Sequence, residues 1–289
     1  MRLSERTVLA SLHVGSWSGN AVDRDVTEEV SERHSADIQG AGRYSKQLAS
    51  KKFLKEVNGA VSIARRTHRL LTLPWDESAR ILSTTGYQNY TEQMRMNRLK
   101  VEAGADQLVQ QWASVINEAR SRLGTMFDLE DYPVAEVIRK KFYVDVEIKP
   151  VPEAGDFRAE LSDQSVKAIT KDIEKRIDRR LELALNDVFQ RIIDVTGHMV
   201  GRLRAYKPVE EGRAENTFKD SLVYNCKELA EMLPALNITQ DPRLDQLHKQ
   251  ILDQLTEFSP EILRDNERLR NQTADRAEKI LKKVSGFLA

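Results

Sequence analysis

The sequence predicts an all-α protein, an elongated helical bundle with long antiparallel helices and a minor two-stranded β element. Charged residues make up 31% of the chain and aromatic residues only 6%, a balance typical of long helices with solvated faces. Apolar residues recur every three or four positions through several long segments, which is the spacing of one face of an α-helix. Strict alternation of apolar and polar residues, the pattern of a half-buried strand, is clear in one short stretch only.

The first expected elements are short. Thr7 to Val14 is rich in apolar and β-branched residues and glycines follow it closely, so we expect a strand and then a turn. Residues 23–34 predict a short acidic helix that ends before Gly40.

Two longer helices are expected next. From about Tyr44 to Leu71 apolar residues recur at helical spacing, and Leu73-Pro-Trp75 ends this helix because proline removes a backbone donor. Thr91 to Leu123 predicts a second long helix, which Gly124 stops and which Gly104 weakens.

The best strand signal lies in the middle of the chain. Phe142 to Pro150 alternates apolar and polar residues, and a short helix through Val137 precedes it. Because a lone strand is not stable, it needs a partner. We expect that partner to be the strand at Thr7 to Val14.

The longest predicted helix runs from about Ser162 to Tyr206. Its apolar residues repeat with a mean spacing of about 3.7, which is nearer an eleven-residue repeat than a heptad, and its length is about 65 Å. A narrow apolar seam needs a partner, so we expect the helix to pack antiparallel to Thr91–Leu123 or to another subunit.

The C-terminal part predicts three more helices. Prolines separate the segments Ala214–Leu233, Pro242–Phe258 and Glu261–Leu288. We therefore expect two domains: a long-helix core with the small β element at residues 1–206, and a helical tail domain at residues 207–289.

Composition limits the cellular compartment and the partners that we expect for this protein. The 45 basic and 45 acidic residues cancel, so the total charge implies no anionic partner. No stretch approaches the roughly 18 consecutive apolar residues of a membrane-spanning helix, and no signal peptide is recognisable. The single cysteine, Cys226, excludes an intrachain disulfide and is expected to be buried. We expect a cytoplasmic protein with no membrane partner.

The motifs favour no catalytic, metal or cofactor site, and we expect no enzyme. Gly15-Ser-Trp-Ser-Gly19 lacks the central serine of a nucleophile elbow, residues 40–46 lack the spacing of a phosphate-binding loop, and the five histidines are too dispersed for a zinc site. One enzymatic alternative is open. Asp131 with Glu147-Ile-Lys149 matches the carboxylate and Glu-x-Lys pattern of metal-dependent nucleases, which also need a supporting sheet.

The charge is unevenly distributed along the chain. Between residues 43 and 69 there are eight basic residues and one acidic residue, Glu56, so this segment carries a net charge of about +7. On a helix most of these cations share the face opposite the apolar stripe. Aromatic residues follow, on which unpaired bases would stack. The predicted nucleic-acid site comprises Arg43, Lys46, Lys51, Lys52, Lys55, Arg65, Arg66, Arg69, Trp75, Tyr87 and Tyr90.

These residues predict a non-enzymatic accessory protein that binds nucleic acid, with single-stranded DNA or RNA favoured by the aromatic residues. Two alternatives remain. The same cations would also be explained by pairing with the acidic residues 23–37 of the chain itself. The second alternative is an oligomeric structural or adaptor protein whose long helices contact other subunits or a partner protein, with no nucleic acid.

A resemblance to a known family adds to this interpretation. Five short motifs followed by a long helix resemble a helical protein family of tailed phages and their bacterial hosts; these motifs are Lys46-Gln-Leu48, Leu73-Pro-Trp75, Leu123-Gly-Thr-Met-Phe127, Asp131-Tyr-Pro133 and Pro150-Val-Pro152. The resemblance covers roughly residues 1–206. That family has no assigned activity, so no catalytic residue is carried over. It implies an accessory role in phage-type DNA metabolism or particle assembly, inside a bacterial host cell.

Overall fold

The computed structural model describes residues 2–38, 40, 42–153, 162–208 and 217–288. The chain forms two compact units. The first unit comprises Met1–Ser11, Arg69–Asn89 and Ile148–Ala289, and the second comprises Leu12–His68 and Tyr90–Glu147. The expected division between residues 206 and 207 is not observed, because the long helix and the C-terminal helices share one hydrophobic core in the first unit.

The β structure is larger than the sequence predicts. A four-stranded sheet has the order β4-β5-β1-β6, formed by Leu73–Pro74, Arg80–Ser83, Thr7–Gly15 and Tyr143–Pro150. The expected neighbourhood of β1 and β6 is confirmed. Strands β1 and β5 pair antiparallel from Thr7 opposite Ser83 to Ala10 opposite Arg80. Strands β4 and β5 were not predicted, because runs of two and four residues are too short to show an alternation of apolar and polar side chains.

A separate antiparallel pair joins β2 (Asn20–Val22) to β3 (Ser45–Gln47). The expected helix from Tyr44 is therefore wrong in its first turns, which form a strand instead. Between these strands lies α2 (Arg24–Arg33), as predicted, and the Asp23 side chain caps it by accepting a hydrogen bond from the backbone N–H of Val26.

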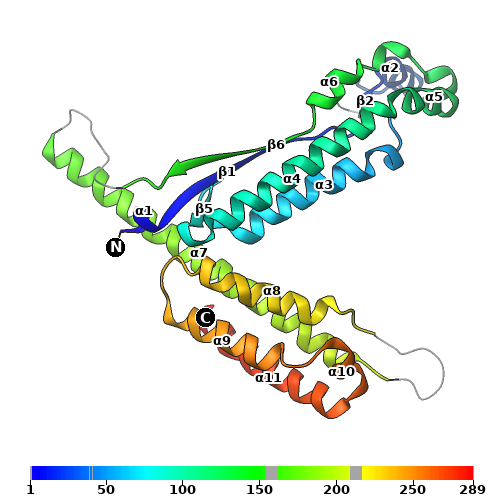
Figure 1. The fold of residues 1–289 in the computed structure, drawn as a ribbon. Coiled ribbons are helices and arrows are strands. Elements are labelled where there is room, and N and C mark those ends of the chain that lie inside the picture. The colour runs from blue at the N-terminus through cyan, green and yellow to red at the C-terminus, as the bar shows by residue number, and fades with distance from the viewer. Residues whose placement is uncertain (1, 39, 41, 154–161, 209–216, 289) are drawn as a thin grey trace. The chain divides into compact units, whose positions relative to one another are not determined.

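Helices α3 (Lys51–Leu71) and α4 (Thr84–Gln110), most of whose residues belong to the second unit, lie side by side and antiparallel (Figure 1). Gly104 permits this contact, since a Cβ at that position would lie 3.0 Å from the Cα of Val57. The predicted second helix is interrupted at Gln111, and α5 (Trp112–Leu123) follows. The expected weak point at Gly104 is thus a packing contact, and the break comes seven residues later.

Short elements complete the second unit. Two 3₁₀ turns, η1 (Gly124–Met126) and η2 (Leu129–Asp131), precede α6 (Ala135–Lys140), which is the expected short helix. An aromatic cluster joins these turns to the N-terminal segment, with the rings of Trp17 and Trp112 at 5.7 Å between centroids.

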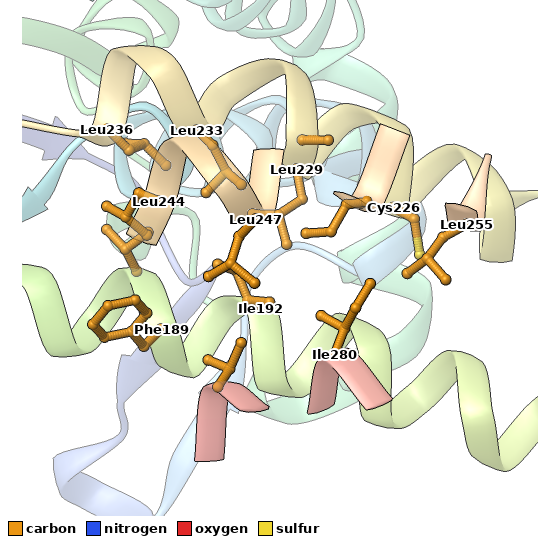
Figure 2. Packing of buried hydrophobic residues seen from close by; sticks show 14 of the residues in the cluster. Phe189, Ile192, Cys226, Leu229, Leu233, Leu236, Leu244, Leu247, Leu255 and Ile280 are labelled. Atoms are coloured by element: carbon orange, nitrogen blue, oxygen red, sulfur yellow. The ribbon is translucent and has the colours of Figure 1, made fainter. Parts of the chain in front are cut away.

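The first unit is built on α7 (Asp163–Ala205), whose length agrees with the prediction. Its closest neighbours are α11 (Glu267–Leu288) and α8 (Ser221–Leu236), so the expected pairing with Thr91–Leu123 is wrong. Figure 2 shows how side chains of α7, α8, α9 (Pro242–Leu255) and α11 meet in one core. The labelled residues are Phe189, Ile192, Cys226, Leu229, Leu233, Leu236, Leu244, Leu247, Leu255 and Ile280.

Other boundaries differ from the predictions. Helix α8 begins at Ser221 and includes Pro234, whereas residues 214–216 of the predicted segment lie outside the described residues. The single helix expected from Glu261 is divided into α10 (Pro260–Asp265) and α11 at Asn266. A four-residue helix, α1 (Leu3–Arg6), precedes β1.

Candidate nucleic-acid interface

Helix α3 separates apolar and cationic residues onto opposite faces. Its buried residues recur every three or four positions and face the interior of the protein; they are Leu54, Val57, Val61, Ala64 and His68. The opposite face exposes five cations of the second unit, Lys51, Lys52, Lys55, Arg65 and Arg66. We call these five residues the α3 cation face.

No carboxylate neutralises the α3 cation face within the part of the chain that the structure describes. None of the ion pairs there includes any of the five side chains, and the first turn of α3 contains no acidic residue. Three lysines near the N-terminus of a helix add to the positive end of its dipole, which disfavours the isolated helix and attracts anions. Glu56 is the one acidic residue of α3 and is exposed, so residues 51–66 carry five cations against one carboxylate and a net charge of about +4.

Short side chains occupy the middle of the same face. Asn58, Gly59 and Ser62 lie between the three lysines and the two arginines, and the Ser62 hydroxyl donates to the backbone carbonyl of Asn58 at 2.8 Å. A Cβ at Gly59 would have no atom within 4 Å. The cations thus form two groups, and the side chains between them on this face are short.

Lys46 does not belong to this surface, in contrast to the prediction. It is 7% exposed, and its ammonium lies 2.9 Å from Asp23 and 2.6 Å from Asp131 while donating to the carbonyl of Met126 at 3.2 Å. Burial by itself lowers the pKa of Lys46, but the hydrogen bonds with Asp131 and Asp23 outweigh it and leave the pKa raised. Lys46 is a buried cation that ties β3 to η2 and to the N-cap of α2.

The expected stacking residues are largely buried. Trp75 is 4% exposed and the guanidinium of Arg180 lies 5.2 Å from its ring centroid. Tyr90 is 0% exposed and its hydroxyl lies 2.8 Å from Nδ1 of His68. Only Tyr87 is exposed, and it falls in the first unit. Trp75 and Tyr90 therefore leave the predicted site, because neither presents a ring face to a base.

The remaining predicted cations, Arg43 and Arg69, are exposed but are not counted in the α3 cation face. Arg43 lines two cavities of about 480 and 380 Å³, together with Thr27. Arg69 lies on α3 four residues after Arg65 but falls in the first unit, where its backbone carbonyl accepts from Arg191 at 2.9 Å. The α3 cation face is accordingly smaller than the predicted set and more regular.

Of the four cations between residues 80 and 100, three are paired and Lys100 is exposed. On α4, Arg95 lies 2.8 Å from Glu92, and Arg98 lies 2.6 Å from Asp145. The guanidinium of Arg80 donates to the carbonyl of Thr72 at 3.0 Å. These contacts distinguish them from the α3 cation face.

The acidic segment at residues 23–37 does not pair with α3 in the described structure. Asp23 contacts Lys46, and Glu29 contacts Arg33 of its own helix at 3.0 Å. The other α2 carboxylates are exposed and join no ion pair with α3 among the residues described. Intrachain pairing therefore does not explain the basic face.

The residues of the nuclease alternative have other contacts. Asp131 contacts Lys46, and a carboxylate oxygen of Glu147 lies 3.5 Å from Nε2 of His13. Throughout the described ranges, no group of three or more histidine, cysteine or acidic side chains is placed to hold a metal ion. This geometry gives no support to a metal-dependent nuclease.

Comparisons of the chain with protein-family models, with curated proteins and with solved structures found no significant match. In the part of the chain that is described, none of the helices has the length and apolar character needed to cross a membrane. The functional argument therefore rests on the geometry of the α3 cation face.

Proposed function

We propose that this protein is a non-enzymatic nucleic-acid-binding accessory protein and that the α3 cation face is its binding surface. The observation that carries the proposal is the exposure of five cations on one rigid helix, with no carboxylate partner among the described residues. Cations that are already paired would have to break an ion pair before binding a phosphate. These five would not.

Phosphate contacts set the expected strength and salt dependence. Each neutralised phosphate of duplex DNA releases counterions and contributes about −0.9 to the slope of log affinity against log salt concentration. Five contacts predict a slope of about −4.5, so affinity should fall roughly 500-fold between 50 and 200 mM salt. Such binding carries no sequence preference by itself.

The surface argues against strong recognition of individual bases. Stacking on an aromatic ring contributes about 1–3 kcal/mol per base in proteins that prefer single strands. Of the three predicted stacking residues, Trp75 and Tyr90 are buried and Tyr87 is exposed, so the aromatic basis for a single-strand preference is weakened. The proposed recognition is of the sugar-phosphate backbone.

The proposal is tested by charge reversal with a matched control. The triple variant Lys51→Glu, Lys52→Glu, Lys55→Glu should weaken binding at 50 mM salt at least 100-fold and make the slope about 2.7 less steep, because three phosphate contacts are lost. The control reverses three exposed lysines of α7, Lys167, Lys171 and Lys175, with the same change in net charge. Equal loss in both variants would show that only net charge matters and would refute the proposed surface.

A second candidate is an elongated, oligomeric structural or adaptor protein, and α7 favours it. None of the residues Asp163–Leu183 is buried, and the apolar Val166, Ile169 and Ile173 are half-exposed and lie outside the core cluster. Burial of such a stripe against another subunit would stabilise the helix. Light scattering tests this candidate by measuring the mass of the protein in solution. A mass several times 33.1 kDa, reduced to that of one chain in the double variant Ile169→Asp, Ile173→Asp, would support it. A monomeric wild-type protein would exclude it.

The phage-type setting remains part of this proposal. Its basis is the resemblance of roughly residues 1–206 to a helical protein family of tailed phages and their bacterial hosts, and this setting implies a cytoplasmic location in the host cell.

A further inference from the structure

We infer that the α3 cation face recognises duplex DNA by bridging the phosphates on the two sides of one groove, with the lysine group on one strand and the arginine group on the other. This inference rests on the proposed function and names its substrate class. Two features carry it: the spacing of the two cation groups and the short side chains between them on the same face.

The spacing fits a groove of B-form DNA. At a rise of about 1.5 Å per residue, Lys55 and Arg65 are about 15 Å apart along the helix axis, and Lys51 and Arg66 about 22 Å. The major groove of B-form DNA is about 12 Å wide, and the phosphates line its two edges. A helix that lies across the groove would therefore place one cation group over each edge.

Between the two groups, the face that carries the cations has short, uncharged side chains, those of Asn58, Gly59 and Ser62. Glu56, the one acidic residue of α3, and Ile63 are exposed on the flank of this face. Gly59 costs about 1 kcal/mol relative to alanine in the middle of a helix, yet its Cβ position is open. No packing contact among the described residues requires glycine there, whereas a Cβ at Gly104 would lie 3.0 Å from the Cα of Val57. The stretch of short side chains would lie over the open centre of the groove, between its two phosphate edges.

Rigidity and charge density favour a duplex over a single strand. Helix α3 is held along its length by its buried face and by α4, so the distance between the two cation groups does not adapt to a flexible chain. For the same five contacts, counterion release contributes about −0.9 per phosphate on duplex DNA and about −0.7 per phosphate on a single strand to the slope of log affinity against log salt concentration. Trp75 and Tyr90 are buried, so these two rings offer a single strand no stacking gain.

The same geometry disfavours duplex RNA. The major groove of an A-form helix is deep and narrow, so its phosphate edges are not separated by the width that the two cation groups span. Its minor groove is wide and shallow and is recognised through 2′-hydroxyl groups.

The test compares three probes by fluorescence anisotropy with the full-length protein at 50, 100 and 200 mM salt. The probes are a 30-base-pair DNA duplex, one of its strands alone, and an RNA duplex of the same sequence. We expect the DNA duplex to bind at least tenfold more tightly than the other two, with a salt slope of about −4.5. Equal or tighter binding of the single strand or of duplex RNA would overturn the inference and leave nucleic-acid binding intact. No binding of any probe would refute the proposed function itself.

Two variants test the bridging geometry. Lys51→Glu, Lys52→Glu, Lys55→Glu should make the duplex slope about 2.7 less steep, and Arg65→Glu, Arg66→Glu about 1.8 less steep. Bridging also requires that either variant binds the duplex no more tightly than it binds the single strand. A variant that keeps the full duplex preference would show that one cation group is sufficient, and bridging would then be wrong.

Discussion

Replacement of Lys46 by methionine should destabilise the second unit without changing nucleic-acid binding. The methionine side chain fills most of the same volume but removes the ammonium, which leaves Asp23 and Asp131 close to each other without their cation. Breaking a buried ion pair by removing one partner costs about 3–5 kcal/mol. Asp131 is 26% exposed at its side chain, so water relieves part of this loss and we expect about 3 kcal/mol.

The pH dependence of this loss follows from the pKa shifts. The backbone N–H of Val26 and then Lys46 hold the pKa of Asp23 below its usual value, so its contribution to stability is present above the unfolded pKa of about 3.9 and is lost as pH falls through the folded pKa. The raised pKa of Lys46 keeps its contribution until pH rises above about 10.4. The difference between wild type and variant should be constant from about pH 5 to 10 and shrink below pH 4.

Urea unfolding followed by tryptophan fluorescence measures the effect. Trp17 and Trp112 are both buried in the second unit and report on it. Lys100→Met, which removes an exposed lysine of α4, is the control and should change the free energy of unfolding by less than about 0.5 kcal/mol. A Lys46→Met protein of unchanged stability but reduced salt slope in DNA binding would refute the reasoning, because Lys46 would then act at the interface.

Three further outcomes are expected. Gly104→Ala should lower the free energy of unfolding by roughly 1–3 kcal/mol in urea titrations, since the new methyl group would lie 3.0 Å from the Cα of Val57, and an unchanged midpoint would contradict the close approach of α3 and α4. Gly59→Ala should instead raise the free energy of unfolding by about 0.5–1 kcal/mol, because a Cβ there would meet no other atom within 4 Å. Gly201→Ala on α7 should have the same effect for the same reason. A destabilised Gly59→Ala protein would mean that this part of α3 is covered. Burial raises the pKa of the Cys226 thiol to about 12, so alkylation at pH 8 should proceed only in denaturant, and rapid modification of the native protein would contradict its position in the core.

The helices and strands that the sequence predicted best are those whose signal is local. The repeat of apolar residues in α3 and α7 and the alternation in β6 arise from the geometry of one chain segment, and one or two turns suffice to display it. Short elements have no such signal, so β4, β5 and the break at Gln111 were missed. Their positions depend on neighbours that are distant in sequence.

The candidate site shows the same difference between local and long-range signals. The exposure of the α3 cations followed from the helical wheel, because the buried and exposed faces of one helix are determined together. The burial of Lys46, Trp75 and Tyr90 had no local signal, since each depends on a contact with another segment: Asp131, Arg180 and His68.

The sequence alone therefore determined a mostly helical chain and one strongly cationic helix face, because both follow from side-chain periodicity within a segment. Only the tertiary structure decided which cations remain unpaired, since an ion pair depends on distances between segments that composition does not contain. The acidic α2 could have covered α3, but its neighbour Asp23 contacts Lys46 instead, and five cations of α3 are left facing solvent.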